Sequence, residues 1–512
     1  MSGARISQPS VTYTNVPAQV LIGPNPQKVL MVGMMADDGD ATEKTLIHID
    51  STDDYINFFK NSSLTEMITA FKQTNPLTHL DVIGVKPDST GSSATGKITL
   101  AGSGKKDGKL TVFVGNKNNS ASVTTTDAEG RADVASRLTE AINKANLPIT
   151  AAVTSETIDL TYRYKGVEGN VIGVKIVNDA SGITPTLTPL AGGTDSLSLS
   201  DVFDVVKGER YQTVIWPFSD KMDTVKGFLE PRWNVTNNVL DGVSITVVQE
   251  SASDAVDRLG RLDQKTSVVF VNGIINSGLQ NTGCIFETPE NIAAMIGAFR
   301  SLRYTEDALL TQYLTTSAGK DQFGGPALGA LPYFNTLFPY LDPVPVGQGF
   351  IDTQIEELAS VGGSVLGNNK AGTNVILGEV HTTYKNDPAG NPDPTYHYLN
   401  AVDVQSIARE YFYLNTAKRF AQTRLTEGGI FDGRDMANEG VIRSFLIGLY
   451  KQLAGPDYVI VQAGADQVEF FDDNLIVELD LVKGKISIQM KCCFVVQART
   501  FVGTIEFAFS IN

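Results

Sequence analysis

The amino-acid sequence predicts an α+β, multidomain protein. An α/β layered domain carries an inserted mostly-β domain and is followed by an α+β C-terminal domain, with extended arms at both ends. Buried-type strand patterns alternate with helical patterns in two separated stretches, as is typical of a parallel α/β layer. The stretch between them starts in a Gly/Ser-rich segment and is rich in short strands. A last strand pattern continues almost to the final residue, ending at Ile511.

Composition narrows the possible classes of protein. With 512 residues the chain is too long for one core and predicts about three domains. A net charge of -16 argues against generic nucleic-acid binding, which needs a basic surface. The sequence has no apolar signal core and no apolar run of membrane-spanning length. We therefore expect synthesis in a cytoplasm-like compartment, with no nucleic-acid partner and no membrane insertion. Cys284 and the adjacent Cys492 and Cys493 are expected to be reduced thiols, since neighbouring strand residues point to opposite faces.

Residues 1–27 are predicted to form an N-terminal extended arm. Four prolines interrupt this stretch, and they exclude a helix because proline lacks the N–H and clashes with the preceding turn. One β-prone run inside the arm is a candidate for pairing with a sheet edge. It consists of Val11, Thr12, Tyr13 and Thr14.

The α/β domain is predicted to cover residues 28–90 and 194–345. Its strands are expected at 28–33, 80–85, 212–216, 243–248 and 267–271. Its helices are expected at about 55–59, 64–73, 197–206, 222–237, 252–262 and 291–303. The remaining part, 310–345, is rich in Gly, Pro and aromatic residues and is expected to be a connector draped over another surface.

Residues 91–193 are predicted to be the inserted mostly-β domain. Short strands are expected near 97–101, 110–114, 122–125, 149–153, 158–164 and 171–177, with one helix near 131–145. A chain that leaves an α/β layer and returns to it in this way is typical of a domain inserted into a loop.

The C-terminal domain is predicted over residues 346–500, and a C-terminal strand or arm over 501–512. The domain is expected to hold helices at about 403–425 and 435–453, a strand at 374–381, and closing strands at 474–482 and 485–496. In the final strand, alternate residues are apolar and share one face: Phe501, Ile505, Phe507 and Phe509. This aromatic edge either pairs within its own sheet or extends the sheet of a neighbouring copy.

Four patterns invite a catalytic or metal-binding interpretation, and none supports one. Gly91–Lys97 matches a phosphate loop, but Ile98 stands where the Mg²⁺-binding Ser or Thr is required, and a strand follows. Asp37–Asp40 lacks the further spaced carboxylate of a cation site. The four histidines share no metal-ligand spacing, although His381 and His397 are expected to lie near each other. The run at 362–367 lacks the spacing of a nucleophile elbow.

The helical segment 403–453 differs in charge from the rest of this acidic chain, because basic residues slightly outnumber acidic ones there. Such a segment favours a contact with an acidic partner, but ordinary solvated helix faces explain it equally well. The candidate contact residues do not fall on one helical stripe. They are Arg409, Lys418, Arg419 and Arg424.

Taken in order, these elements resemble the contractile tail sheath proteins of myophages, in their Mu-like branch. The likeness spans most of the chain and is carried by Lys28–Gly33, Asp53–Phe59, Met67–Pro76, Leu80–Val85, Gly166–Asn170, Leu190–Thr194, Tyr211–Pro217, Pro231–Trp233, Val375–Thr383, Tyr398–Val404 and the closing strands. The chain departs from the family at 310–345 and at Gly378-Glu379, where the family has an Arg-bearing strand start.

The resemblance implies a structural subunit without enzymatic activity or cofactor. Such subunits stack as hexameric rings around a tail tube and contract to drive the tube through the host envelope. The implied partners are further copies of the chain, the tail tube protein, and baseplate and tail terminator proteins. The implied location is the virion tail, after assembly in the host cytoplasm.

The resemblance also implies roles for the predicted parts. The N-terminal arm and the C-terminal strand would join the sheets of neighbouring subunits, the inserted domain would lie on the outer surface, and the C-terminal domain would face the tube. The sheath of a phage-tail-like bacteriocin or a secretion-type injection system is an alternative. An α/β enzyme or binding protein is a more remote one, because α/β layers often bind ligands at strand ends.

Overall fold

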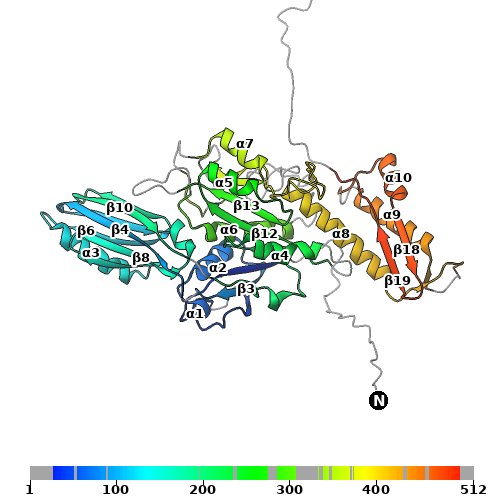
Figure 1. Ribbon diagram of the computed structural model, residues 1–512, viewed down its shortest axis with the longest axis horizontal. Helices are drawn as coiled ribbons and strands as arrows, with labels where there is room; N and C mark the ends of the chain where they lie inside the picture. Colours follow the sequence, from blue (N-terminus) through cyan, green and yellow to red (C-terminus); the bar gives the residue numbers. More distant parts are fainter. Residues whose placement is uncertain are drawn as a thin grey trace, which may run out of the picture.

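The protein forms an elongated molecule with three lobes in a row (Figure 1). A computed structural model describes residues 27–50, 55–87, 90–194, 197–233, 239–274, 285–306, 333, 338, 340–344, 349–368, 372, 374–430, 435–455 and 460–495. The central lobe is an α/β layer, the β-rich segment 93–191 lies at one end, and the C-terminal elements lie at the other.

An eight-stranded sheet organises the central lobe, with the strand order β15-β14-β13-β12-β11-β1-β3-β2. Its strands are β1 (Lys28–Met34), β2 (Leu46–Ile49), β3 (His79–Val85), β11 (Thr213–Ile215), β12 (Val243–Gln249), β13 (Ser267–Asn272), β14 (Gly363–Asn368) and β15 (Asn374–Leu377). All neighbouring pairs are parallel except the two at the edges, β2 with β3 and β14 with β15. The inner strands are rich in Val and Ile and almost fully buried, as expected for a parallel sheet covered on both faces.

Helices cover both faces of this sheet. On one face, α2 (Ser63–Thr74) and α6 (Pro289–Glu306) share a hydrophobic cluster with strand residues such as Val29 and Val82. On the other face lie α4 (Met222–Trp233), α5 (Ala252–Gly260) and α7 (Asp352–Ser360). Short α1 (Tyr55–Phe59) precedes α2.

The segment between β3 and β11 builds two smaller sheets around one helix. One sheet has the order β10-β4-β8-β7 and the other β6-β5-β9. The elements are β4 (Ser93–Gly102), β5 (Gly108–Val114), β6 (Asn116–Thr125), α3 (Arg131–Lys144), β7 (Ile149–Thr154), β8 (Thr157–Lys165), η1 (Val167–Val171), β9 (Val174–Asp179) and β10 (Ile183–Ala191). A continuous hydrophobic cluster joins this segment to the central sheet, including Ile98 and Leu110 with Leu30 and Val214.

The C-terminal lobe is built on a long helix, α8 (Leu399–Phe420). Around it lie β16 (Arg424–Leu425), β17 (Met436–Ala437), α9 (Glu439–Leu453), α10 (Ala465–Asp473), β18 (Ile476–Asp480) and β19 (Lys485–Gln489). Phe471 stacks on Tyr450, with ring centroids 4.3 Å apart, and lies 6.1 Å from the ring of Phe412. These aromatic side chains hold α8, α9 and α10 in one core.

The predicted α+β, multidomain fold class is confirmed. Two element predictions are wrong. Residues 363–368 and 374–377, assigned to the C-terminal domain from the sequence, are strands of the central sheet, because β14 pairs with β13. The predicted helix 197–206 is mostly irregular and contains only a short 3-10 helix, η2 (Asp204–Val206), although Leu199, Val202, Phe203 and Val206 are buried at helical spacing.

Some elements were not foreseen, namely β2, β10 and α10. The predicted arm at 1–26 and the strand at 501–512 lie outside the described residues, as does most of the connector 310–345. Within the described part of the chain, none of the helices combines the length and the apolarity that crossing a bilayer requires.

Candidate functional site

Helix α8 is the mechanical link between the central and C-terminal lobes (Figure 1). Its first turns belong to the core of the central lobe, where Leu399 and Val402 are buried against the sheet side. Its later turns belong to the C-terminal core through Phe412 and Phe420. Because one continuous helix of 22 residues contributes to both cores, the two lobes are coupled through a stiff element.

A buried ion pair fixes the start of α8 to the central lobe. Arg300, on α6, donates a hydrogen bond of 2.6 Å from Nη2 to Oδ1 of Asp403 and one of 2.7 Å from Nη1 to the carbonyl of Gln212. The hydroxyl of Tyr333 donates to Oδ2 of the same carboxylate, and burial beside Asp403 raises the pKa of Tyr333. Such a pair is costly to break, since the remaining charge would be buried alone.

A second polar cluster lies at the same joint, around the fully buried carboxylate of Asp241. Nη2 of Arg210 lies 3.5 Å from Asp241, and Nη1 of Arg409 lies 3.8 Å from it. Arg210 also bonds Glu410 of α8 at 2.9 Å. The guanidinium of Arg409 lies over the ring of Trp233, 5.3 Å from its centroid. Two arginines from different lobes thus share one buried acid, which ties α8 to the loop that precedes β12.

The predicted tube-facing residues are in two different places. Arg409 belongs to the joint just described and is only partly exposed. Lys418, Arg419 and Arg424 are exposed together near the far end of α8 and in β16. Arg419 makes an exposed ion pair of 3.3 Å with Asp435, which leaves it largely in solvent.

The closing strands form a separate hairpin. In β18 and β19 the pairing is antiparallel, from Ile476 opposite Gln489 to Asp480 opposite Lys485. Within the part of the chain that the structure describes, this hairpin pairs with no further strand, and Ile476 is half exposed. The predicted arm residues Val11–Thr14 and Phe501–Phe509 lie outside the described residues, so their pairing stays a prediction.

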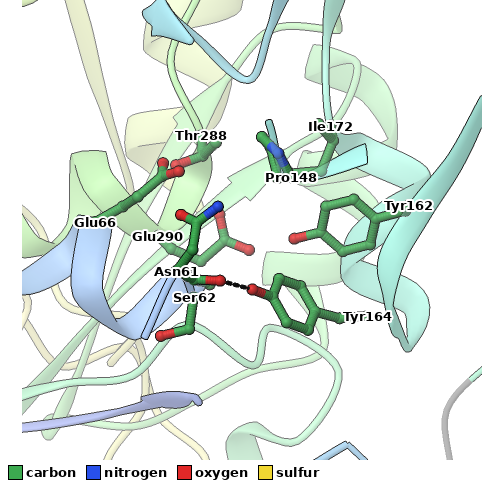
Figure 2. A pocket seen from close by; sticks show the side chains of 10 residues that line it. Asn61, Ser62, Glu66, Pro148, Tyr162, Tyr164, Ile172, Thr288 and Glu290 are labelled. Atoms are coloured by element: carbon green, nitrogen blue, oxygen red, sulfur yellow. Dashed lines mark hydrogen bonds between the residues drawn. The ribbon is translucent and has the colours of Figure 1, made fainter. Parts of the chain in front are cut away.

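A buried acidic cluster lies where the β-rich segment meets the central lobe (Figure 2). It comprises the partly buried Glu66 on α2 with two buried carboxyl groups, Glu287 just before α6 and Glu290 in its first turn. Glu66 accepts hydrogen bonds from the side-chain amides of Asn116, at 3.2 Å, and Asn119, at 2.9 Å, both from β6. A carboxylate of one lobe is thus held by amides of another.

Two tyrosines of β8 complete this junction. Figure 2 shows the rings of Tyr162 and Tyr164 directed toward Glu290 and Asn61. The hydroxyl of Tyr164 donates to the backbone carbonyl of Asn61. Oε2 of Glu290 is buried and accepts no hydrogen bond from the described residues. The remaining space offers about 10 Å³ for the centre of a water molecule, close to the minimum for a single water.

Burial changes the acidity of these three carboxyl groups. It raises the pKa of Glu287 and that of Glu290 to about 7 each, and the charge of Glu66 adds to the effect in both. Burial also raises the pKa of Glu66, against the opposing hydrogen bonds of Asn119, Asn291 and Asn116. The junction therefore takes up protons in a range where ordinary carboxyl groups are ionised.

Several sequence hypotheses can be checked against this geometry. Residues 93–97 of the phosphate-loop-like run belong to strand β4, so no helix N-terminus follows the glycines. His381 and His397 are neighbours as predicted, with ring centroids 5.0 Å apart. The other two histidines also lie together, since His48 and His79 meet beside Asp81, which their spacing in the sequence did not indicate. The buried acidic cluster was missed too, since its members are distant in sequence and follow no local pattern.

Comparison with known proteins identifies a relative in sequence. No protein-family model matches the chain. The chain is 23% identical over 466 residues to the Mu-like prophage FluMu tail sheath protein of Haemophilus influenzae. The match covers 88% of this chain and 87% of that protein, so the similarity concerns nearly the whole length of both and not a shared module.

Solved structures of sheath proteins superpose loosely on the chain. The sheath tail protein from Desulfitobacterium hafniense is 11% identical, with 95% of this chain and 100% of that chain covered and a TM-score of 0.44. The sheath tail protein from Listeria innocua is 11% identical, with 93% of this chain and 93% of that chain covered and a TM-score of 0.44. The helical sheath of the anti-feeding prophage in its contracted state is 10% identical, with 99% of this chain and 100% of that chain covered and a TM-score of 0.46. These TM-scores are too low to place individual residues in an assembly.

The similarity to a curated tail sheath protein confirms the family that the residues resemble. It runs through the central layer, the β-rich segment and the C-terminal lobe alike, given its coverage. The chain is a homologue of the Mu-like phage tail sheath proteins.

Proposed function

We propose that this protein is the structural subunit of a contractile phage tail sheath. It polymerises as stacked hexameric rings around the tail tube and contracts to drive the tube through the host envelope. The observation that carries the proposal is the match to a tail sheath protein over 88% of this chain and 87% of the relative. Because the relative is a prophage tail protein, a phage tail is favoured over a bacteriocin or a secretion-type sheath.

The proposed role is mechanical, without enzymatic activity. The polar groups described at the α8 joint are used in contacts between lobes, such as the pair of Arg300 with Asp403. The energy for contraction then comes from additional surface that subunits bury against one another, not from hydrolysis of a nucleotide. Stiff lobes joined by α8 transmit a rotation at one contact surface to the others.

Connectivity between subunits is assigned to the two ends of the chain. We infer that the arm with Val11–Thr14 and the strand with Phe501–Phe509 add to C-terminal sheets of neighbouring copies. Strand addition supplies main-chain hydrogen bonds that persist while lobes swing about flexible connections. The hairpin of β18 and β19 supports this proposal, because its outer edges are unpaired within the described residues.

The lobes are assigned to radial positions. The domain at 91–193 would lie on the outer surface of the sheath, and the C-terminal domain would face the tube. Three exposed basic side chains near the far end of α8 suit an acidic partner surface: Lys418, Arg419 and Arg424. Arg409 would contribute to the joint between lobes instead.

The proposed partners are further copies of the chain, the tail tube protein, and the baseplate and tail terminator proteins. The proposed location is the virion tail, after assembly in the host cytoplasm. Neighbouring genes for a capsid protein and a terminase would support the phage assignment, whereas their absence beside a lysis cassette would favour a bacteriocin.

Electron microscopy of the purified full-length protein tests the proposal. In negative stain we expect striated tubes or stacked rings, with sixfold symmetry in end views. A compact monomer that persists at high protein concentration, alone and with tube protein added, would contradict it.

A further inference from the structure

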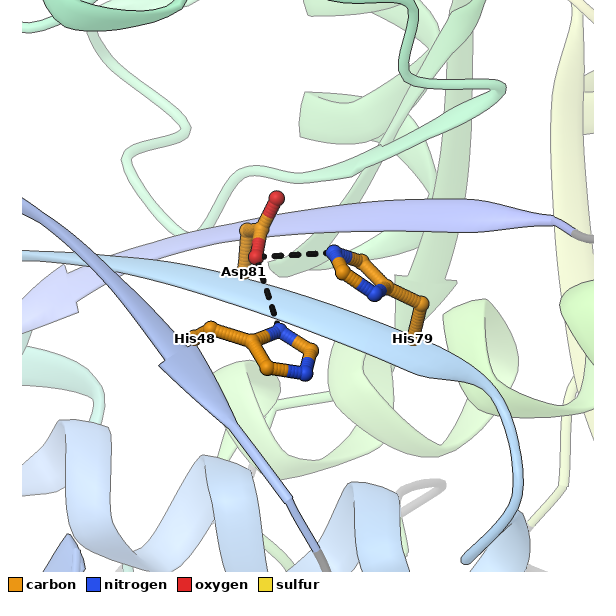
Figure 3. A group of neighbouring side chains, drawn as sticks. All are labelled: His48, His79 and Asp81. Carbon is orange, nitrogen blue, oxygen red and sulfur yellow. Dashed lines mark hydrogen bonds and ion pairs between the residues drawn. The ribbon is translucent and has the colours of Figure 1, made fainter. Parts of the chain in front are cut away.

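Three metal-ligand side chains meet at the edge of the central sheet (Figure 3). His79 and Asp81 are two residues apart on β3, so they lie on the same face of the sheet. His48, on the antiparallel edge strand β2, is paired directly opposite Asp81 in the sheet register. The topology therefore places two imidazoles beside one carboxylate.

The distances between the ligand atoms suit a single metal ion. Nδ1 of His48 and Nε2 of His79 each lie 3.0 Å from Oδ1 of Asp81. One ligand atom from each of the three residues lies within 4.8 Å of the other two. Ligands bound at about 2.0–2.2 Å in tetrahedral geometry are roughly 3.3–3.5 Å apart, so a small outward movement makes room for an ion.

His48 lies between two carboxylates. Its Nδ1 faces Asp81, and its Nε2 lies 3.0 Å from Oδ1 of Asp50. A neutral imidazole carries one N–H and can donate to only one of these carboxylates. With a metal ion on Nδ1, the N–H of His48 lies on Nε2, where it donates to Asp50.

The second imidazole lies against the first. The rings of His48 and His79 are stacked, with centroids 3.9 Å apart and planes inclined by 24°. One divalent cation at the edge of this stack, beside Oδ1 of Asp81, would use Nδ1 of His48 and Nε2 of His79 as ligands. Binding requires the rings to turn slightly apart, which their partly exposed positions allow.

Further residues form hydrogen bonds to the proposed ligands and orient them, as in known metal sites. Asp50 faces the nitrogen of His48 that points away from Asp81, a common arrangement for a ligating imidazole. The buried hydroxyl of Tyr211 donates a hydrogen bond of 2.6 Å to Oδ2 of Asp81. This bond leaves Oδ1 directed at the two histidines. Asp81 is only 5% exposed and is therefore held in place by its surroundings.

We propose that His48, His79 and Asp81 bind one divalent transition-metal ion of the zinc class. Two imidazoles and one carboxylate are a donor set that such ions favour, and an ion of this size binds it with solvent in the remaining position. The ion would fasten the short edge strand β2 to β3. Strand β2 makes four residue pairings, all with β3, so a ligand on each strand adds a crosslink at the end of the sheet.

Metal binding is tested on the full-length protein without a histidine tag. After removal of metal with a chelator and dialysis, ZnCl₂ is titrated by calorimetry, and CoCl₂ is titrated with the visible absorption of Co²⁺ as readout. We expect one ion per chain, a Co²⁺ spectrum with nitrogen and oxygen ligands, and a higher melting temperature with Zn²⁺. The Co²⁺ spectrum of the wild-type protein does not depend on whether any variant folds.

Variants locate the ion. His48→Gln and His79→Gln should each weaken Zn²⁺ binding by more than tenfold, and Asp50→Asn by roughly 10–100-fold, as for loss of an orienting partner. His397→Gln is the matched control. His397 also lies beside another histidine, His381, with ring centroids 5.0 Å apart, but both belong to a distant part of the sequence. The proposal is overturned if the wild-type protein takes up no Zn²⁺ at one ion per chain, or if binding is the same in His48→Gln and His79→Gln as in His397→Gln.

Discussion

Arg300 and Asp403 form a buried ion pair of 2.6 Å that joins α6 of the central lobe to α8 of the C-terminal lobe, and neither side chain is more than 4% exposed. The position of this ion pair matters more than its net contribution to the free energy of unfolding. Buried pairs contribute little net stability compared with apolar residues of the same size, but they admit few alternative geometries. We interpret this pair as a device that fixes the direction in which α8 leaves the central lobe.

Removing one partner of this pair should be strongly destabilising. Asp403→Leu leaves the Arg300 guanidinium buried without its acid, and we expect a loss of about 3–5 kcal/mol in the free energy of unfolding. The double variant Arg300→Met with Asp403→Leu should regain part of that loss, because no charge remains buried. Urea unfolding measures both. Arg419→Met, which removes an exposed pair with Asp435, is the control and should cost less than about 1 kcal/mol. Equal effects at the two sites would refute this interpretation.

The acidic junction should make the stability of the protein depend on pH. The folded-state pKa values of Glu287 and Glu290 are about 7, above the ordinary value of 4.5, and that of Glu66 is also raised. Between pH 4.5 and about 7 the folded state therefore binds more protons than the unfolded state. The stabilisation is fully present below pH 4.5 and is lost as the pH rises through about 7.

Replacing one of these carboxyl groups by its amide tests the sign of this effect. Glu290→Gln mimics the protonated form, so we expect a higher melting temperature than wild type at pH 8 and little difference at pH 4.5. Glu129→Gln is the opposite control. Desolvation raises the pKa of Glu129, but hydrogen bonds from Thr126 and the ion pair with Arg137 together lower it below its ordinary value, so its amide should be less stable at neutral pH. The melting temperature of Glu290→Gln is compared with that of wild type at each pH. If this difference is less favourable to the variant at pH 8 than at pH 4.5, the prediction is contradicted.

Local patterns were enough to predict most of the central layer. Strands such as β1 and β13 are short runs rich in Val, Leu, Met and Phe between turn signals, and helices with capping serines stand between them. Ser251, for example, accepts a hydrogen bond from the backbone N–H of Asp254 at the start of α5. The spacing of buried residues and the helix caps both depend on residues close together in the chain, so both can be recognised from the sequence alone.

The contacts between distant residues could not be predicted in this way. Nothing in 363–368 indicates that it pairs with β13 in the central sheet, because parallel pairing depends on elements far apart in the chain. The same limit applies to His48 and Asp81, which face each other only because β2 is paired with β3 in one register. Strand β2 is short and mostly exposed, so it carries little of the apolar signal by which strands are recognised.

The exposed basic group near the end of α8 should bind the tail tube if the C-terminal lobe faces it. Charge reversal in the variant Arg419→Glu with Arg424→Glu should weaken co-assembly with tube protein, because it replaces attraction to an acidic surface by repulsion. Co-sedimentation at low and high salt measures the effect, and the difference should shrink at high salt. Arg131→Glu, an exposed charge reversal in the β-rich segment, is the control. Co-assembly that is unchanged in the double variant would dismiss this contact.

The last strand should be required for polymerisation and not for folding of the subunit. In Phe501–Ile511, the aromatic residues fall on one face, and burying that face against a neighbouring sheet would be blocked by a charge. We expect that deletion of 501–512, or Phe507→Asp, abolishes sheath tubes in negative stain. Circular dichroism and the melting of the central and β-rich lobes should stay unchanged, because the cores described for these lobes are built from earlier parts of the chain, with residues such as Leu30, Ile98 and Phe299. Val177→Asp, at an exposed apolar position of β9, should polymerise normally. Tubes formed by the truncated protein would show that another segment links the subunits, and the Val11–Thr14 arm would be the next to delete.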